Sequence, residues 1–365
     1  MKILPIYTKS KNYNIYIGHN IINQLSKIIK KENIKFKKSL IIVDKNIPKN
    51  IFKKIYPKIK CEKKLTFYFN SSEKNKNLSC VNSILNKLFI NNFSRNDLII
   101  CLGGGIASDV SAFAASIYKR GMKFINFPST LLAQVDSSIG GKTGISNQFG
   151  KNMIGSFYQP DLVVSDTSLL KSLPKREIIC GYAEILKHSL IKNKKFFLFL
   201  DKNLKNILKL KKNFIEKAIL ESCKIKKQII EKDEKENNLR KSLNLGHTFG
   251  HSYEATLNYS KKLNHGEAVL YGILSAAKFS NTFNFLNQYE YELIKSHLTK
   301  LGFVNLNKFF KKKDLNKIIG FMISDKKNNT KKINLIILKK IGNVDILNQF
   351  NSNKVKRFIN SQLIK

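Results

Sequence analysis

Cysteine is scarce in this chain of 365 residues, and the few cysteines lie far apart. Cys61, Cys80, Cys101, Cys180 and Cys223 show no C-x-x-C spacing. The sequence therefore predicts neither a disulfide framework nor a thiolate zinc site. This pattern is typical of a reducing compartment, and we expect a cytoplasmic protein.

Long hydrophobic runs are also missing. No stretch of about 18 consecutive apolar residues occurs, so no membrane span is predicted. The N-terminal segment is interrupted by Pro5 and becomes polar at Lys9, so no signal peptide is expected. Hydrophobic residues still make up 42% of the chain, which is enough to bury a core and excludes a disordered tail protein. Because single cores stop growing at about 250–300 residues, two domains are expected.

Acidic residues and arginine are under-represented. The chain has 25 Asp and Glu against 66 Lys and Arg, a net charge of +41, and only five of the basic residues are arginine. Such a charge is typical of nucleic-acid-binding proteins. However, the basic residues are spread over the whole chain, and arginine is the side chain that base and phosphate recognition favours. We attribute most of the charge to an A+T-rich genome, whose codons favour Lys, Asn and Ile, while it can still attract an anionic substrate.

The first half of the chain alternates short apolar runs with helical patterns. Strands are expected over residues 39–44, 97–102, 123–128 and 162–166, with helices between them such as 81–90 and 106–118. This alternation predicts an α/β domain with a doubly wound, Rossmann-like parallel sheet.

The second half has a different pattern. Helical periodicity covers residues 177–191, 196–210, 213–233, 247–257 and 267–285, and the next strand candidate is 333–338. We therefore expect an α/β domain over residues 1–174 and a mainly α-helical domain over residues 175–365. The active site is expected where the carboxyl ends of the strands meet the helical half.

Two glycine-containing segments suggest binding of a phosphate-rich ligand. Gly103-Gly104-Gly105 follows an expected strand and begins an expected helix, whose N-terminus can bind phosphate. The turn lacks the third glycine of G-x-G-x-x-G, and a purely structural turn is the alternative, but three glycines favour a dinucleotide. The segments 128–144 and 150–155 add hydroxyls, glycines, Lys142 and Lys151, which suit a ligand with phosphate and hydroxyl groups.

Histidine is rare, yet three of the six histidines lie close together in the sequence. His247 and His251 are spaced i, i+4 on one predicted helix, and His265 begins the next. Glu184 lies on an otherwise apolar helix face and offers an oxygen ligand. Although single histidines are usually structural, this cluster favours a catalytic metal site with an open position. A Ser-His-Asp site is less favoured, because the chain has no G-x-S-x-G motif.

Several motifs together resemble the 3-dehydroquinate synthase family, a group of sugar phosphate cyclases. The resemblance spans about residues 70–280 in order and spacing. The matching blocks are Gly103 to Asp109, Arg120-Gly121, Pro128 to Ser138, Gly140 to Thr143, Gly150 to Gly155, Asn244 to His251 and His265 to Val269.

The resemblance implies the fold, the reaction and the cofactors. Members of the family are carbon–oxygen lyases of the shikimate pathway, which leads to chorismate and the aromatic amino acids. They convert 3-deoxy-D-arabino-heptulosonate 7-phosphate to 3-dehydroquinate and phosphate. NAD first oxidises a ring hydroxyl, phosphate is then eliminated, the carbonyl is reduced back, and an intramolecular aldol step closes the carbocycle. NAD is regenerated, and one divalent metal ion, zinc or cobalt, is required.

The resemblance also assigns residues to roles. It implies the metal ligands Glu184, His247 and His265. The implied NAD-binding residues are Ser71, Ser72, Glu73, Lys74, Asn75, Lys76, Gly105, Ile106, Ala107, Ser108, Asp109, Ser129, Thr130, Lys142, Lys151, Leu169, Leu170, Lys171 and Ser172. The implied catalytic and substrate-contacting residues are Asp136, Lys142, Asn152, Lys187, Lys227, Arg240, Asn244, His251 and Lys326, together with Arg120, which reaches across a homodimer interface.

Some positions depart from the family pattern. Ser71-Ser72 stands where the family has Asp-Gly, Asn75 replaces an aromatic residue, and Ser108 replaces a glycine. The resemblance therefore predicts a lost ribose contact, a crowded pyrophosphate turn and weaker NAD binding. Ser129 and Ser172 replace threonines and keep the hydroxyl.

Three alternatives remain open from the sequence. Other sugar phosphate cyclases share the metal and NAD, and polyol dehydrogenases of the glycerol dehydrogenase type share the fold. A basic nucleic-acid-binding protein is the alternative from another class, and we expect no nucleic-acid or membrane partner.

Overall fold

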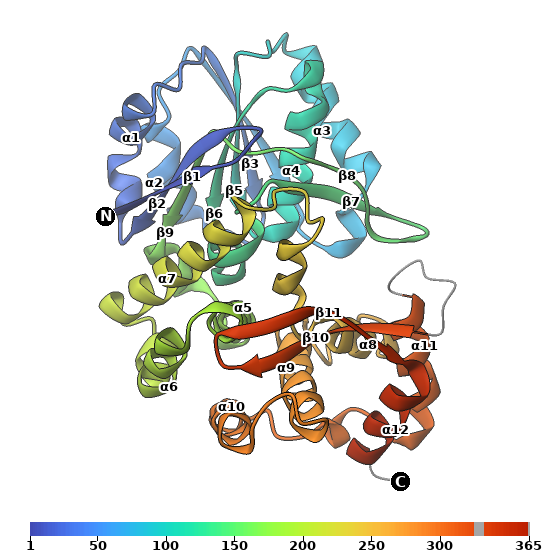
Figure 1. Cartoon of the computed structure of the whole chain (residues 1–365). Helices are drawn as coiled ribbons and strands as arrows, with labels where there is room; N and C mark the ends of the chain where they lie inside the picture. The colour runs from blue at the N-terminus through green and yellow to red at the C-terminus, as the bar shows by residue number, and fades with distance from the viewer. Residues whose placement is uncertain (325–331, 364–365) are drawn as a thin grey trace. The chain divides into compact units, whose positions relative to one another are not determined.

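The structure is a computed structural model that describes residues 1–324 and 332–363 (Figure 1). The chain forms two compact units. The first unit comprises Met1–Gly181 and Asn206–Lys235, and the second comprises Tyr182–Lys205 and Glu236–Lys365. The expected boundary at residue 174 would place residues 206–235 in the second unit, whereas the structure places them in the first.

The first unit is built on a seven-stranded sheet with the order β1-β2-β9-β6-β5-β3-β4. The strands are β1 (Lys2–Tyr7), β2 (Asn12–Gly18), β3 (Lys38–Asp44), β4 (Lys63–Phe69), β5 (Leu98–Gly103), β6 (Lys123–Pro128) and β9 (Leu162–Asp166). Only β1 is antiparallel to its neighbour. The central strands β3, β5 and β6 are apolar and buried along nearly their whole length, as expected for parallel strands covered on both faces.

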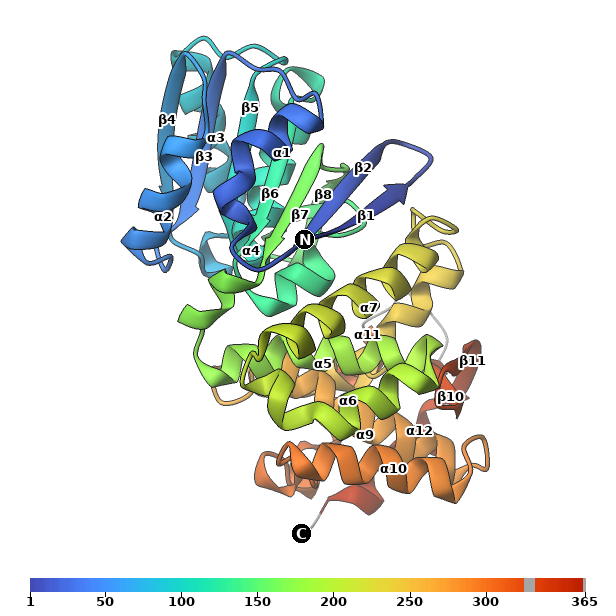
Figure 2. The same cartoon turned by 90° about the vertical axis from the view of Figure 1, so that its left-hand side faces the viewer.

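Helices cover both faces of this sheet (Figure 2). Apolar side chains of α3 (Leu78–Ile90) and α4 (Gly105–Ile117) pack on one face. Residues of α1 (Leu25–Lys31) and α2 (Lys49–Ile55) pack on the other. The helices that follow the adjacent strands β3 and β5 thus lie on opposite faces, which makes the β3–β5 boundary the topological switch point where α/β sheets bind ligands.

Three further elements complete the first unit. β7 (Lys142–Asn147) and β8 (Gly150–Phe157) form a separate antiparallel hairpin. A short π-helical segment spans Ala133–Ser137, and a 3₁₀ segment spans Thr167–Ser172. α7 (Lys212–Ile230) packs with this unit, where Glu231 accepts a hydrogen bond from Tyr7 N and Glu234 accepts one from Ser10 N.

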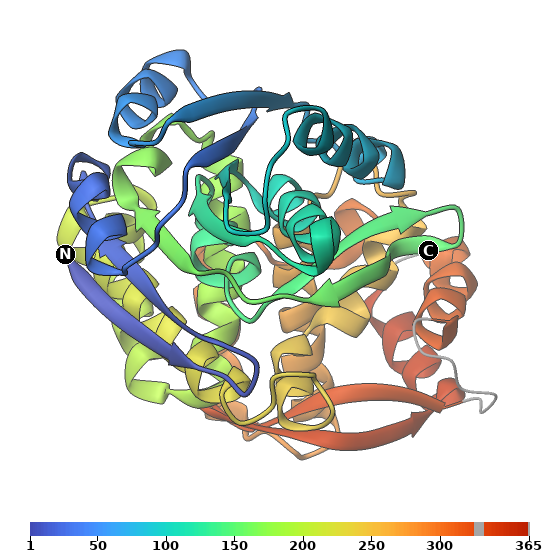
Figure 3. The same ribbon diagram turned by 90° about the horizontal axis from the view of Figure 1, so that it is seen from above.

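The second unit is mainly helical. Its helices are α5 (Lys175–Lys192) and α6 (Lys194–Leu208), which both continue from or into the first unit, and α8 (His247–Thr256), α9 (His265–Thr282), α10 (Gln288–Lys300), α11 (Leu315–Ser324) and α12 (Ser352–Gln362). Two strands, β10 (Lys332–Lys340) and β11 (Asn343–Asn351), form an antiparallel ribbon, drawn in red in Figure 3.

The structure agrees with the predicted architecture of a doubly wound parallel sheet and a helical second unit. It also contains strands that were not predicted, namely β1, β2, β4, β7, β8 and β11, and helices outside the predicted ranges, namely α1, α2, α10, α11 and α12. The five cysteines all lie among the described residues, and no disulfide joins any of them. Among the described residues, no helix is both long and apolar enough to cross a bilayer.

Candidate active site

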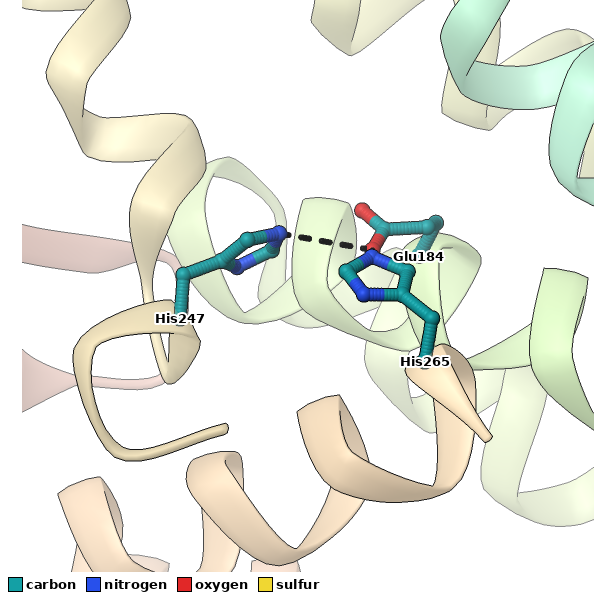
Figure 4. Close-up of side chains that lie close together, drawn as sticks. All are labelled: Glu184, His247 and His265. Carbon is teal, nitrogen blue, oxygen red and sulfur yellow. Dashed lines mark ion pairs between the residues drawn. The ribbon is translucent and has the colours of Figure 1, made fainter. Parts of the chain in front are cut away.

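Three side chains in the second unit converge on one point. Glu184 projects from α5, His247 is the first residue of α8, and His265 is the first residue of α9. The Nε2 atoms of His247 and His265 lie 3.7 and 3.9 Å from Glu184 Oε1. Figure 4 shows the carboxylate and the two imidazole rings turned toward one another. The structure thus brings the three predicted metal ligands together.

Close packing of α8 against α9 places the two histidines beside each other. A Cβ atom on Gly250 would lie 2.9 Å from Ala268 O, and one on Gly272 would lie 2.1 Å from Gly246 O. Gly246 also has a φ of 78°, a left-handed conformation that suits glycine. The glycines that flank His247 in the sequence are therefore required for the approach of these helices.

The start of α9 is fixed by its own cap. The Asn264 side chain accepts a hydrogen bond from Glu267 N, and the Glu267 side chain accepts one from Asn264 N. Such a capping box satisfies backbone donors at the helix start. It also holds His265 at a defined position on the first turn.

The buried carboxylate of Glu184 fits a divalent cation. Its side chain is 0% exposed, and its Oε1 accepts no hydrogen bond from any described residue. A buried carboxylate is costly unless a cation or donor faces it. Lys187 makes an ion pair with the other oxygen, Oε2. Donor atoms bound to one tetrahedral zinc ion lie about 3.3 Å apart, so the observed spacing needs only a small contraction.

The protonation of His247 also suits metal binding. Burial, the Lys187 ammonium and the neighbouring histidines hold the pKa of His247 well below its ordinary value. His247 is therefore neutral at physiological pH, the form that binds a metal. For His265, burial lowers the pKa, but the hydrogen bond and charge of Glu254 outweigh it and raise the pKa overall.

Of the other predicted residues of the second unit, His251 adjoins this cluster. The His251 ring lies 5.1 Å from the His247 ring and 5.9 Å from the His265 ring, between centroids. Arg240 is buried in the 3₁₀ segment Leu239–Asn244. Asn244 donates a hydrogen bond to Glu236 Oε1 at 3.1 Å. Glu236 was not predicted as a site residue, and it lies outside any helix, so no periodicity in the sequence marks it.

In the first unit, the glycine turn joins β5 to α4 at the topological switch point. Each glycine is tightly surrounded: a Cβ on Gly103 would lie 2.6 Å from Ala107 Cβ, and one on Gly104 would lie 3.1 Å from Thr130 Cγ2. Gly104 caps α4 without a side-chain hydrogen bond, so the first N–H groups of α4 are available for a phosphate. Ser129 N donates to Gly103 O at 2.9 Å, which brings Ser129 and Thr130 to the turn.

Asp44 was not predicted as a site residue. It ends β3, directly beside β5, and its Cβ would lie 3.3 Å from a Cβ on Gly103. An acidic residue at the end of the neighbouring strand binds the ribose hydroxyls in dinucleotide-binding folds. The glycine turn therefore has a carboxylate nearby, even with the predicted loss of an acidic ribose contact at Ser71.

Ser108 does not project into the glycine turn. Its hydroxyl accepts a hydrogen bond from Asn126 Nδ2 at 2.5 Å, and both side chains are buried. Asn126 lies on β6, so the extra hydroxyl at position 108 is used in the interior of the unit. The expected crowding of the turn by Ser108 was therefore wrong.

Three predicted residues of the first unit form a connected polar group. The Lys76 ammonium lies 2.5 Å from Asp109 Oδ2 and 2.5 Å from Asn152 Oδ1. Burial raises the pKa of Asp109 although Lys76 opposes this shift. The β8 residue Asn152 is exposed and has a φ of 55°.

The rest of the segment 71–76 precedes this group. Ser72 accepts a hydrogen bond from Asn75 N and so caps a short 3₁₀ turn. Glu73 accepts a hydrogen bond from Ser146 at 3.1 Å, and Lys74 is exposed. The departures at Ser71, Ser72 and Asn75 are therefore compatible with an ordered segment, and their effect on NAD affinity stays a prediction.

Lys226 rather than Lys227 approaches Asp136. The Lys226 ammonium lies 2.5 Å from Asp136 Oδ1 and 2.6 Å from Asp136 O, and the residue is buried. The predicted residue Lys227 lies on another face of α7, 3.7 Å from Glu231 Oε1 and 5.2 Å from the Tyr7 ring centroid. The positions that pack inward on α7, including Ser222 and Cys223, share a helix face with Lys226, and this periodicity was the missed signal.

The remaining predicted residues occupy several places. Lys142 and Lys151 are exposed on β7 and β8, and Arg120 is exposed in the 3₁₀ turn Tyr118–Arg120 after α4, with a φ of 64°. Leu169 and Leu170 are buried. Leu169, Lys171 and Ser172 line a cavity of about 710 Å³ beside α2. Lys326 lies outside the described residues.

Known proteins resemble the chain over its whole length. A family model described as 3-dehydroquinate synthase N-terminal matches residues 66–180, and one described as 3-dehydroquinate synthase C-terminal matches residues 181–328. A 3-dehydroquinate synthase of Pelagibacter ubique (strain HTCC1062) is 55% identical over 363 residues, which cover 99% of each chain.

Solved structures show the same fold. A 2-deoxy-scyllo-inosose synthase in complex with carbaglucose-6-phosphate, NAD⁺ and Co²⁺ has a TM-score of 0.89 at 24% identity, covering 99% of this chain and 100% of the other. A 2-epi-5-epi-valiolone synthase from Streptomyces hygroscopicus subsp. jinggangensis 5008, with NAD⁺ and Zn²⁺ bound, has a TM-score of 0.85 at 19% identity, covering 98% of each. With family models over most of its length and a relative of this identity, the chain belongs to the 3-dehydroquinate synthase family.

Proposed function

We propose that the chain converts 3-deoxy-D-arabino-heptulosonate 7-phosphate to 3-dehydroquinate and phosphate, using NAD catalytically and one divalent metal ion. The observation that carries this proposal is the buried Glu184 carboxylate facing two imidazole nitrogens, in a chain 55% identical to a 3-dehydroquinate synthase. Such a ligand set leaves a coordination position open for substrate oxygens.

The first unit is proposed to bind NAD. Its glycine turn and the start of α4 provide N–H groups for the pyrophosphate, and Asp44 provides an acceptor for ribose hydroxyls. The residues of the cavity beside α2 that were predicted to bind NAD, Leu169, Lys171 and Ser172, extend the site. The proposal is supported by the NAD⁺ in both cyclase structures, which have the same fold.

The second unit is proposed to hold the metal ion through Glu184, His247 and His265. When bound, zinc or cobalt supplies a Lewis acid that polarises a substrate oxygen, and NAD accepts and returns a hydride. The chain's own residues bind and orient the anionic substrate. Lys187 is buried beside Glu184, and its ammonium can donate to a substrate oxygen as well as balance the carboxylate.

Further cations and polar groups are proposed to contact the substrate. Arg240 offers a planar donor fork for phosphate or carboxylate. Asp136 makes an ion pair with Lys226, so we assign to Lys226 the substrate contact that the family resemblance implied for Lys227. Asn152, His251 and Asn244 keep their predicted roles as proposals.

Phosphate release from the heptulosonate phosphate tests the proposed reaction. Purified protein with metal should release phosphate only when NAD is present, in catalytic amount, and the NADH absorbance band should not grow. A polyol dehydrogenase would instead accumulate NADH in proportion to its product. Stoichiometric NADH, or turnover that survives complete metal removal, would overturn the proposal.

A homodimer in the cytoplasm is also proposed. Met153, Ile154 and Phe157 are apolar and exposed along β8, and exposed apolar side chains on both faces of a strand can contribute to an interface. Tyr158, which follows β8, donates to Met122 O at 2.6 Å, so this surface adjoins the segment that carries Arg120. Light scattering should give twice the chain mass, and Ile154→Glu should yield monomers.

A further inference from the structure

A buried carboxylate lies behind one of the metal-site histidines. Glu254 belongs to α8, is only 7% exposed, and has no role in the proposed reaction so far. Its Oε2 lies 3.0 Å from His265 Nδ1. The opposite ring nitrogen, Nε2, is the one that faces Glu184 Oε1. The imidazole of His265 therefore lies between two carboxylates, one on each nitrogen.

This contact decides where the imidazole hydrogen resides. An ionised carboxylate accepts hydrogen bonds and has none to donate, so the ring must carry its hydrogen on Nδ1. The lone pair of the neutral ring is then on Nε2, directed at Glu184. His247 has the same arrangement from a different acceptor, because its Nδ1 lies 3.3 Å from the carbonyl oxygen of Leu245. Both rings are thus set to bind through Nε2.

Glu254 also lies in a second group of residues whose ligand atoms are close enough to hold a metal ion. His251, Glu254 and His265 each offer a ligand atom within 4.8 Å of the other two. A metal ion in this group would have to replace the hydrogen on His265 Nδ1. The hydrogen-bond distance between Nδ1 and Glu254 instead agrees with a protonated Nδ1 and a carboxylate outside the coordination sphere.

We propose that Glu254 is a positioning residue that fixes the tautomer and the orientation of His265 and does not itself bind the metal. The proposal rests on the metal site of the proposed function. A carboxylate that accepts from the far nitrogen of a ligating imidazole makes the near nitrogen more basic and prevents the ring from turning. Without that acceptor, the hydrogen can occupy either nitrogen, and a hydrogen on Nε2 blocks metal binding.

The tautomer can be read in protein that carries no metal. In ¹⁵N-histidine-labelled protein, long-range ¹⁵N–¹H spectra distinguish Nδ1–H from Nε2–H, and the spectrum of His265→Gln assigns the His265 signals. Wild-type protein should show Nδ1–H for His265. Glu254→Leu, which has similar size but no acceptor, should lose this pattern, and Glu254→Gln should retain it, because the amide oxygen still accepts.

Cobalt affinity and the cobalt absorption spectrum give the second readout. Glu254→Leu should bind Co²⁺ about 10–100-fold more weakly, whereas Glu254→Gln should lose less. Glu290 is the matched control, since it is equally buried in the second unit but pairs with Lys194 and Ile341 N. Glu290→Leu should leave the cobalt affinity of the folded protein unchanged.

Each outcome supports or overturns the proposal. An unchanged tautomer and cobalt affinity in Glu254→Leu would overturn it. If Glu254→Leu at saturating Co²⁺ shows a changed visible spectrum with a lower coordination number, Glu254 is a metal ligand, and the proposal is overturned. If wild-type protein binds no Co²⁺, the proposed metal site fails, and a His265 ring with its hydrogen on Nε2 would independently contradict the role of Glu254.

Discussion

The contact between α8 and α9 makes Gly272→Ala a sharp test of how packing builds the metal site. The new Cβ would lie 2.1 Å from Gly246 O, where ordinary contacts begin at 3.4 Å. The two backbones must therefore separate by about 1.3 Å, since neither partner is a flexible side chain. Overpacking typically costs about 1–3 kcal/mol. Because this contact is with rigid backbone and very short, we expect Gly272→Ala to lower the free energy of unfolding by about 3 kcal/mol, the upper end of that range.

The displaced helices carry His247 and His265 at their first residues. A misplacement of about 1 Å can reduce the activity of a site by about 100-fold, and we expect Co²⁺ affinity to fall at least 10-fold. Gly320→Ala on α11 is the control, because its Cβ would meet nothing within 4 Å and alanine favours a helix by up to about 1 kcal/mol. Chemical denaturation and Co²⁺ titration measure both effects. If Gly272→Ala unfolds and binds Co²⁺ as Gly320→Ala does, the packing argument is refuted.

Two further predictions concern charged side chains. Lys187→Ala should lower kcat/KM at least about 10-fold in turnover assays through loss of a charge-assisted hydrogen bond, whereas exposed Lys311→Ala should leave it unchanged; equal losses would show that the charge acts globally. The His297 hydrogen bond, and then Lys300, lower the pKa of Asp201 from 3.8 to about 2, so Asp201→Asn should cost about 1–2 kcal/mol at neutral pH. Because the folded pKa is depressed, the stability difference in urea unfolding should shrink as the pH falls from about 4 toward 2, and a difference independent of pH would contradict the assignment.

The sequence predicted the buried strands well and the exposed ones poorly. β6 and β9 begin and end at the predicted residues, because parallel strands buried on both faces are continuous apolar runs. The edge strand β4 has mostly half-exposed positions and begins with two lysines. The exposed strand β8 contains Gly150 and Gly155. Such strands are defined by their partners, and their own hydrophobic pattern is weak.

The cluster of proposed metal ligands was predictable because short motifs carry its residues, whereas side chains placed by packing were harder to assign. Lys226 and Lys227 are neighbours of the same type, and only the rotation of α7 decides which one meets Asp136. Ser108 was expected to crowd the glycine turn, but its partner Asn126 lies on another strand. Contacts between distant segments of this kind follow from the tertiary structure alone.

The placement of α7 has a consequence for synthesis on the ribosome. The first unit includes Asn206–Lys235, although the chain enters the second unit at Tyr182. A nascent chain that has emerged only as far as Gly181 therefore lacks the helix end whose Glu231 and Glu234 bind the β1–β2 hairpin. The ribosome adds about 5–20 residues per second. Several seconds therefore pass between synthesis of Gly181 and synthesis of the helix end that binds the hairpin. The amino-terminal unit is completed only after part of the next unit has already been translated, so chaperones would meet it with one side still uncovered.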